Sequence, residues 1–230
     1  MRIQRLSLRE GAEAARGTTV IIDVYRAFTC EPLMYYLGAS QVLLEAHVDR
    51  CLSFKDQYLL VGEHNELPID GFDLTNSPSQ ILAKGHEFFN GRTVLHRTTS
   101  GVTGATIALP NADEVLLASF ANASATAYYI RQRHPDQVSI VAMGIRSQQP
   151  APEDEWCGAY IESLLCGKPY NHVEAMHQIL NHETAQKFLR GDKPYLPRED
   201  AAICIQRDLF DFALRAEPHN DLILARKVKV

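Results

Sequence analysis

The segment TTVIIDVYRAFT (18–29) begins with an almost unbroken apolar run rich in β-branched residues and then places an acid, Asp23, and a base, Arg26, close together. Such a run is typical of a β-strand covered on both faces, as in the parallel sheets of α/β proteins. The two charged residues fall where the strand would end and a helix would begin. Ligands of open α/β sheets bind outside the carboxyl ends of the strands. The segment therefore predicts a central strand and one edge of a site.

Four further apolar runs end in the same way, in a polar cluster that precedes an expected helix. They are YLLVGE (58–63), RTVLHRTTSG (92–101), EVLLASFANAS (114–124) and VSIVAMGIRS (138–147). If these strands are parallel, their polar ends meet along one rim of the sheet. The residues expected at that rim are Asp23, Arg26, Glu63, Arg97, Thr98, Thr99, Asn122 and Arg146.

Helical segments alternate with these strands over the first 165 residues. The clearest is SPSQILAKG, in which Ser77 is expected to cap the helix, Pro78 to occupy its first position and Gly85 to end it. The alternation predicts a three-layer α/β/α sandwich around a mostly parallel or mixed sheet. We expect one domain over residues 1–230. Its remaining parts are an edge strand at MRIQRLSL, a mainly helical part at 170–215 and a late strand at DLILARKVKV.

Composition narrows the class of protein. The chain has 230 residues, is 46% hydrophobic and 22% charged, and is long enough to bury one sizeable core. No apolar run approaches the roughly 20 residues that span a bilayer, and the first residues do not form a signal peptide. The net charge of −5 argues against nucleic-acid binding. Five scattered cysteines without a CxxC pair indicate reduced thiols. We expect a cytoplasmic protein that contacts neither membrane nor nucleic acid, either a monomer or a homodimer.

No nucleophile for covalent catalysis can be singled out, because the chain has no GxSxG elbow and no cysteine with an arginine five residues later. Metal-assisted chemistry is better supported, since several carboxylates fall at strand ends or in adjoining loops. Hard oxygen ligands of this kind are those that Mg²⁺ prefers. The alternatives are that Asp70 and Asp73 are turn residues and that Glu153 and Asp154 merely favour a helix N-terminus. The candidate ligands of Mg²⁺ are Asp23, Glu63, Glu153 and Asp154.

Groups that bind anions follow the same strands. Arg26 can bind a phosphate with two parallel hydrogen bonds, although a salt bridge to Asp23 is equally easy to build. Two polar turns open expected helices, and exposed amides at a helix N-terminus bind anions. These turns contain Asn76 and Ser77 in the first, and Thr98, Thr99, Ser100 and Gly101 in the second.

The motifs together resemble those of the 2-phosphosulfolactate phosphatase family. The resemblance rests on VIIDVYRAFT (20–29), on GE followed by IDGFDLTNSP (62–78), on TTSG (98–101), on ASFANASATA (118–127) and on APEDEWCGAY (151–160), with a weaker likeness in EDAAICIQRDLFDF (199–212). These segments are collinear and cover most of the chain. The chain departs from the family pattern at Phe28 and Cys30 in the first motif and at Ser100 and Val102 in the turn.

The resemblance implies a Mg²⁺-dependent enzyme, associated with coenzyme M biosynthesis, that hydrolyses 2-phospho-3-sulfolactate to 3-sulfolactate and phosphate. It also places Asp73, Asn76, Ser77 and Asn122 at the site beside the strand-end residues. We expect Arg26 and the amides of Thr98 and Thr99 to stabilise charge on the phosphoryl oxygens.

In this hypothesis a carboxylate positions the attacking water, and Arg97 and Arg146 bind the carboxylate and sulfonate of the substrate. Because of the departures at Phe28, Ser100 and Val102, two alternatives stay open. One is a phosphatase for another small anionic phosphorylated metabolite, and the other is an inactive anion-binding protein of the same fold.

Overall fold

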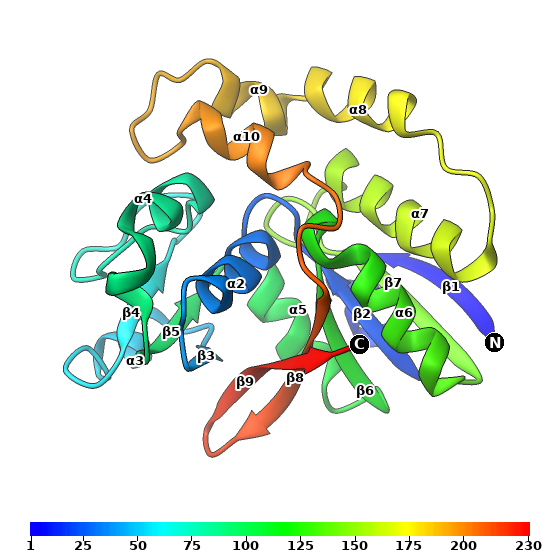
Figure 1. Ribbon diagram of the computed structural model, residues 1–230, viewed down its shortest axis with the longest axis horizontal. Coiled ribbons are helices and arrows are strands. Elements are labelled where there is room, and N and C mark those ends of the chain that lie inside the picture. The colour runs from blue at the N-terminus through cyan, green and yellow to red at the C-terminus, as the bar shows by residue number, and fades with distance from the viewer.

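The computed structural model describes residues 1–230 and contains one nine-stranded sheet with helices on both faces (Figure 1). The strands are β1 (Arg2–Ser7), β2 (Thr18–Ile22), β3 (Gln41–Leu44), β4 (Leu59–Gly62), β5 (Thr93–Arg97), β6 (Glu114–Ala118), β7 (Gln137–Ala142), β8 (Phe212–His219) and β9 (Leu222–Lys229). The helices are α1 (Leu8–Ala14), α2 (Ala27–Tyr36), α3 (Val48–Leu52), α4 (Pro78–Phe89), α5 (Gly101–Ala108), α6 (Ala123–Arg133), α7 (Pro152–Cys166), α8 (His172–Asn181), α9 (Glu183–Leu189) and α10 (Arg198–Cys204), with a 3₁₀ turn η1 at Phe120–Asn122.

The strand order is β1-β7-β2-β6-β8-β9-β3-β5-β4. Strands β1, β7, β2 and β6 form one parallel group, and β3, β5 and β4 form another. The hairpin of β8 and β9 lies between the two groups and pairs antiparallel with both. The predicted mixed α/β sheet is confirmed, and its antiparallel part is this hairpin.

Three successive antiparallel pairings make the two parallel groups run in opposite senses along the sheet. Neighbouring strands are also rotated by roughly 20–25°, so that the six steps from β2 to β4 amount to about 120–150°. This rotation largely offsets the reversal. The carboxyl ends of β2, β7, β4 and β5 therefore reach one place, although they belong to groups of opposite direction.

Alternation along β2 explains why its sequence is almost wholly apolar. Ile21 packs into a core that also contains residues of α1, α2, α4 and α5. Val20 and Ile22 point to the opposite face and pack with residues of α6, α7 and α8. All three side chains are fully buried. The strand is thus covered on both faces, as the three-layer prediction requires.

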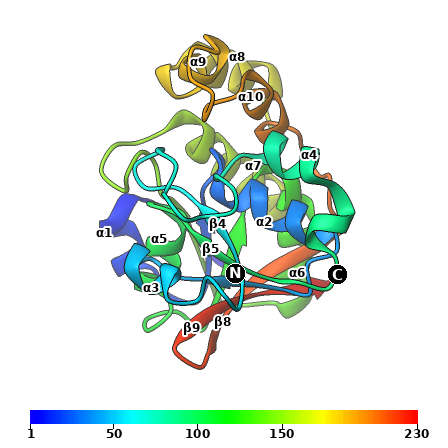
Figure 2. The ribbon, with the colours of Figure 1, turned by 90° about the vertical axis from the view of Figure 1, so that its left-hand side faces the viewer.

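Helices α8, α9 and α10 form a cap above the carboxyl ends of the strands, and it lies at the top in two perpendicular views (Figures 1 and 2). The cap is held by a small core of Phe188, Leu196 and Ala201. None of the helices is both long enough and apolar enough to cross a membrane.

One detail differs from expectation. The helical region predicted up to residue 215 ends at Cys204, and strand β8 begins at Phe212. Phe212, Ala213 and Leu214 are all buried because β8 pairs with β6 and β9, a long-range contact that no local pattern reveals. The predicted helix beginning at Pro78 does end at Gly85, whose backbone is non-helical with a positive φ of 72°, and a second short helical segment of α4 follows the kink to Phe89.

Shortening Ile21 tests the central position of β2. Ile21→Ala should lower the free energy of unfolding by about 2–5 kcal/mol, because a fully buried side chain leaves a cavity. Val173→Ala, at a side chain that is 79% exposed, should change it by less than about 0.5 kcal/mol. Urea denaturation measures both. Equal effects of the two substitutions would contradict the assignment of β2 to the core.

Candidate active site

A polar pocket opens between the carboxyl ends of the strands and the cap. It is lined by Asp23, Tyr25, Arg26, Glu63, Asn65, Glu66, Asn76, Thr99, Ser100, Gly144, Ile145, Arg146, Glu153, Asp154, Thr184, Lys187 and Phe188. Only three of these residues are hydrophobic. The lining comes from the ends of β2, β4, β5 and β7, from the start of α7 and from α9.

Asp23 lies directly after β2 and is almost buried. Its Oδ2 accepts a hydrogen bond of 2.8 Å from the amide of Gly101, and its Oδ1 accepts a longer one of 3.3 Å from Ala27. A Cβ atom on Gly101 would lie 2.9 Å from Asp23 Oδ2 and equally close to the ring of Phe28. Glycine is therefore required at 101 for the helix N-terminus to approach this carboxylate.

Asp154 joins the ends of two neighbouring strands. Its Oδ1 accepts a hydrogen bond from the amide of Val24 at 2.8 Å, and its Oδ2 accepts one from Gly144 at 2.7 Å. Val24 follows β2 and Gly144 follows β7. The first turn of α7 is thereby fixed against the sheet, and the carboxylate of Asp154 is fixed beside Asp23.

Glu63 connects the loops that follow β4 and β5. Its Oε1 accepts the amide of Thr99 at 2.6 Å, and its Oε2 accepts the Thr99 hydroxyl at 3.1 Å and the amide of Glu66. The Thr99 amide, which the sequence placed on the phosphoryl oxygens, is thus already bound by Glu63. Both oxygens of Glu63 orient the protein itself.

Arg26 does not pair with Asp23. Its guanidinium donates to Asp200 Oδ2 and to the carbonyl of Tyr195, both at 3.0 Å, and lies over the ring of Phe188 with 5.3 Å between its central carbon and the ring centroid. Each of these partners belongs to the cap. Arg26 still reaches the pocket, and its remaining N–H groups are available to an anion.

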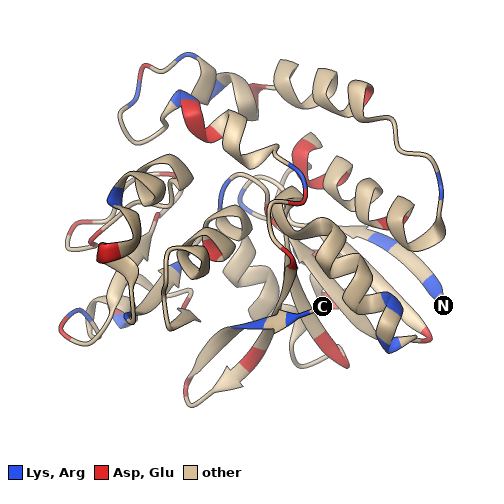
Figure 3. Ribbon diagram, in the orientation of Figure 1, with Lys and Arg blue, Asp and Glu red and all other residues tan.

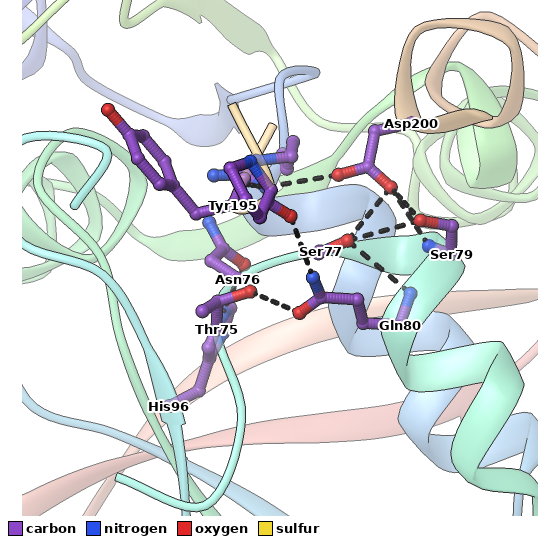
Figure 4. Close-up of polar contacts among 10 residues, drawn as sticks. Thr75, Asn76, Ser77, Ser79, Gln80, His96, Tyr195 and Asp200 are labelled. Atoms are coloured by element: carbon purple, nitrogen blue, oxygen red, sulfur yellow. Dashed lines mark hydrogen bonds and ion pairs between the residues drawn. The ribbon is translucent and has the colours of Figure 1, made fainter. Parts of the chain in front are cut away.

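Asp200 is the residue that ties the cap to the loop before α4. Besides Arg26 it accepts the hydroxyls of Ser77 at 2.9 Å and Ser79 at 2.6 Å, and the Ser79 amide at 3.0 Å (Figure 4). Its side chain is fully buried. Separating a buried carboxylate from its paired arginine strongly destabilises the folded protein. The ion pair with Asp200 therefore fixes the position of Arg26.

The carboxylates of the pocket repel one another. Burial, and secondarily the charge of Glu63, raise the pKa of Asp23 to about 6. Burial raises the pKa of Glu153 to about 7, with a smaller contribution from Asp23. The pKa of Asp154 is raised well above its usual range by burial and then by the charges of Asp23 and Glu153. A cation would relieve this repulsion.

The donor set fits a magnesium ion. No three His, Cys, Asp or Glu side chains are close enough to hold a metal by themselves. Mg²⁺ requires no such cage, because it usually keeps several waters and takes one or two carboxylates together with the phosphate of a substrate. Among neighbouring charges, that of Asp23 contributes most to the raised pKa of Asp154. Glu153 Oε2 accepts the hydroxyl of Thr184 at 2.8 Å, and its Oε1 accepts no hydrogen bond from another residue.

Basic side chains flank the pocket on the cap side. Arg146 and Lys187 line it, and a shallower groove continues from them to Arg190 and Lys193. Lys187 forms an ion pair with Glu66. In Figure 3 the acids at the start of α7 lie below the cap, and the segment from α9 to α10 carries both basic and acidic residues. The pocket thus has an acidic floor and a partly basic rim.

Several residues predicted for the site do not line the pocket. The guanidinium of Arg97 is buried and donates to the carbonyls of Ala46 and Glu63 and to the Thr99 hydroxyl. It is not available to a substrate. Asp73 is exposed outside the pocket, and its carboxylate accepts a hydrogen bond of 2.8 Å from the amide of Leu60. This contact agrees with the alternative that Asp73 is a turn residue.

Four others support the site from behind. Asn122 forms a capping box with Ser119 at the turn η1, where its side chain accepts the amide of Ser119 and donates to the carbonyl of Leu117. The hydroxyl of Thr98 accepts the amide of Val102. Ser77 donates a hydrogen bond to Asp200, and the amide of Gly101 donates one to Asp23. The predicted residues that line the pocket are Asn76, Thr99, Ser100 and Arg146.

The departures from the family pattern affect the pocket unequally. Phe28 and Val102 are fully buried in the core and do not line the pocket. Ser100 does line it. Its hydroxyl makes no hydrogen bond that caps α5. Only the substitution at Ser100 therefore changes the chemistry that a ligand meets.

Asp200 and Lys187 were missed by sequence reasoning. Asp200 stands in the first turn of a helix, where an acid is favoured whatever its function. Lys187 lies on an amphipathic segment whose lysines look like ordinary surface charges. Only the folding of the cap onto the strand ends distinguishes either residue from its neighbours.

The fold and the pocket define a class of protein, an α/β protein whose strand ends gather carboxylates beside groups that bind anions. The 2-phosphosulpholactate phosphatase family model matches residues 5–217. The chain belongs to this family and is a phosphatase, a phosphoric monoester hydrolase.

Named relatives agree with this assignment. A probable 2-phosphosulfolactate phosphatase of Bacillus subtilis (strain 168) is 29% identical over 94% of this chain and 93% of its own length. A protein of the same name from Clostridium perfringens (strain SM101 / Type A) is 29% identical over 87% and 86%. Another from Thermus thermophilus is 35% identical, over 54% of this chain and 52% of its own length.

The repulsion among the acids predicts an unusual dependence of stability on pH. Because the pKa of Glu153 in the folded protein lies at about 7, above its ordinary value of 4.5, the folded state binds this proton more tightly than the unfolded chain does. Without divalent cations, the free energy of unfolding should fall as pH rises through this window, by up to about 3 kcal/mol from Glu153.

Glu153→Gln removes this contribution and should therefore be more stable than the unsubstituted protein at pH 8, with little difference at pH 4.5. Glu162→Gln, in the same helix but outside the pocket, is the matched control. Urea denaturation in the presence of EDTA at both pH values measures the effect. A Glu153→Gln protein that is less stable at pH 8 would contradict a repulsive cluster.

Proposed function

We propose that this phosphatase is magnesium-dependent and hydrolyses 2-phospho-3-sulfolactate to 3-sulfolactate and phosphate. The observation that carries the proposal is the set of buried, mutually repelling carboxylates Asp23, Glu153 and Asp154, which line the same pocket as Arg26 and Lys187. Relatives that match most of the chain are named as probable 2-phosphosulfolactate phosphatases, and these names support the choice of substrate.

Asp23 and Asp154 would hold the ion. Both are kept in place by backbone amides and both have lone pairs free for coordination. Bound Mg²⁺ supplies positive charge to the phosphoryl oxygens and aligns the phosphate for attack. Glu63 has no such freedom, since its carboxylate accepts three hydrogen bonds. Its part is to fix the loops that follow β4 and β5.

Glu153 is the group that positions the attacking water. Its Oε1 accepts no hydrogen bond from another residue, and its pKa of about 7 suits a general base at neutral pH. Thr184, from the cap, holds the other oxygen at 2.8 Å and so orients the carboxylate. The proton taken from the water would reside on Glu153.

Arg26 and the Ser100 hydroxyl provide donors for the phosphoryl oxygens. Arg26 is held rigidly by Asp200 and Tyr195, so no rearrangement is needed when charge develops. Preorganised donors of this kind stabilise the transition state more than the ground state. Arg146 and Lys187 lie at the rim, where the carboxylate and sulfonate of the substrate would be bound.

Removing the charge of Asp23 tests the metal-binding role. Asp23→Asn should lower kcat at least about 100-fold, which corresponds to roughly 3 kcal/mol in the barrier. Activity of the unsubstituted enzyme should disappear with EDTA and return with Mg²⁺. Asp70→Asn, at an exposed acid outside the pocket, serves as the control. Steady-state assays with 2-phospho-3-sulfolactate measure these effects. Unchanged turnover in Asp23→Asn would remove Asp23 from the mechanism.

Lys187 tests recognition of the acidic groups. Lys187→Met should lower kcat/KM for 2-phospho-3-sulfolactate about tenfold, because a charged hydrogen bond is lost. The effect on 2-phospholactate, which has no sulfonate, should stay below about twofold. Lys168→Met provides an exposed control remote from the pocket. If both substrates lose activity equally, Lys187 does not bind the sulfonate.

A further inference from the structure

Behind the pocket, three buried polar side chains from separate elements form a line. Glu31 of α2 and His96 of β5 are fully buried, and Asn76, in the loop before α4, is 3% exposed. His96 Nδ1 lies 3.1 Å from Glu31 Oε1, and His96 Nε2 lies 2.9 Å from Asn76 Oδ1. Figure 4 shows Asn76 next to Ser77 with His96 on the strand below. Asn76 is the only one of the three that lines the pocket.

The two ring nitrogens of His96 face oxygen atoms on opposite sides. Nδ1 faces the carboxylate of Glu31, which anchors one side of the ring in the core. The amide oxygen of Asn76 can only accept a hydrogen bond, so Nε2 is the donor in the bond to Asn76.

This arrangement decides which end of Asn76 faces the pocket. With Oδ1 bound by His96, the Nδ2 group is left with two N–H donors and no protein partner. The opposite orientation would direct an amide oxygen into a pocket already lined by five carboxylates, those of Asp23, Glu63, Glu66, Glu153 and Asp154. A donor at this point suits an anion, whereas an acceptor would repel it.

The line of side chains is not the most stable way to fill this space. Glu31 Oε2 is buried and has no hydrogen-bond partner. Leaving a buried acceptor unsatisfied costs roughly 1–3 kcal/mol. Burial raises the pKa of Glu31, and the neighbouring His96 opposes that rise. An apolar core at these positions would avoid both costs, which indicates that the pair has a role beyond packing.

We propose that Glu31 and His96 are positioning residues that hold Asn76 with its amide N–H groups toward the pocket, where they bind an oxygen of the phosphoryl group. The inference rests on the proposed phosphatase function for the nature of the ligand. It adds a phosphate donor and the two buried residues that keep it in orientation.

Two substitutions of His96 separate orientation from packing. The amide of His96→Asn occupies the place of Nδ1 and keeps the contact to Glu31, but it does not reach Asn76. The longer His96→Gln places an amide nitrogen near the position of Nε2 and can donate to Asn76 Oδ1. Affinity for inorganic phosphate in the presence of Mg²⁺, measured by calorimetry, and kcat/KM for 2-phospho-3-sulfolactate are the readouts.

Asn76→Ala and His96→Asn should each weaken phosphate binding and lower kcat/KM about tenfold, whereas His96→Gln should stay within about threefold of the unsubstituted enzyme. In the double variant, His96→Asn should add nothing to Asn76→Ala, because it acts through that residue. Equal losses in His96→Asn and His96→Gln, or a further loss in the double variant, would overturn the inference. Melting temperatures identify any loss that is due to unfolding.

The donor role of His96 Nε2 gives a test without substitution. The ring ¹⁵N chemical shifts of His96 at pH 7 should show a proton on Nε2, and a bare Nε2 would overturn the inference. If the enzyme binds phosphate in the expected pattern but hydrolyses no 2-phospho-3-sulfolactate, the proposed substrate fails and the role of Asn76 stands. If the enzyme hydrolyses 2-phospho-3-sulfolactate but the variants do not show the expected losses of phosphate binding, the proposed substrate stands and the role of Asn76 is refuted.

Discussion

The hydrogen bond from the amide of Gly101 to the carboxylate of Asp23 joins the two parallel groups of strands at the floor of the pocket. Gly101 follows β5, in one group, and Asp23 follows β2, in the other. Because no side chain fits at position 101, the helix dipole of α5 and the acid come into direct contact. This contact holds the ends of strands from both groups together where the carboxylates, the arginine and the helix N-terminus meet.

In the proposed function, the pocket combines a site for a cation with a site for an anion, and each favours the other. Asp23, Glu153 and Asp154 are buried close together, and a positive partner would relieve their repulsion. A cation bound among them would attract a phosphate, for which Arg26 and Asn76 in the same pocket are the proposed donors. The protein part of the site is rigid, since backbone amides or buried ion pairs hold most of these groups.

Sequence reasoning predicted the strands, the three layers and most of the residues at the strand ends, because apolar periodicity and polar ends are local signals. It failed where the answer depends on contacts between distant segments. The start of the strand at 212–219 was read as part of a helical region that extends to residue 215, since the partners of this strand lie far away in the chain. Arg97 was placed at the site because its position beside Thr98 is right, yet its guanidinium turns into the protein. Asp200 and His96 gave no signal, since burial was what made them important.

The hairpin of β8 and β9 fills the middle of the sheet although it comes last in the chain. During synthesis, the strands on either side of this gap leave the ribosome long before the segment that connects them. Pairing between such distant segments requires a large loss of chain entropy and slows folding. A nascent chain that already carries every pocket residue therefore lacks a joined sheet, and the enzyme becomes active only after its final strands have inserted.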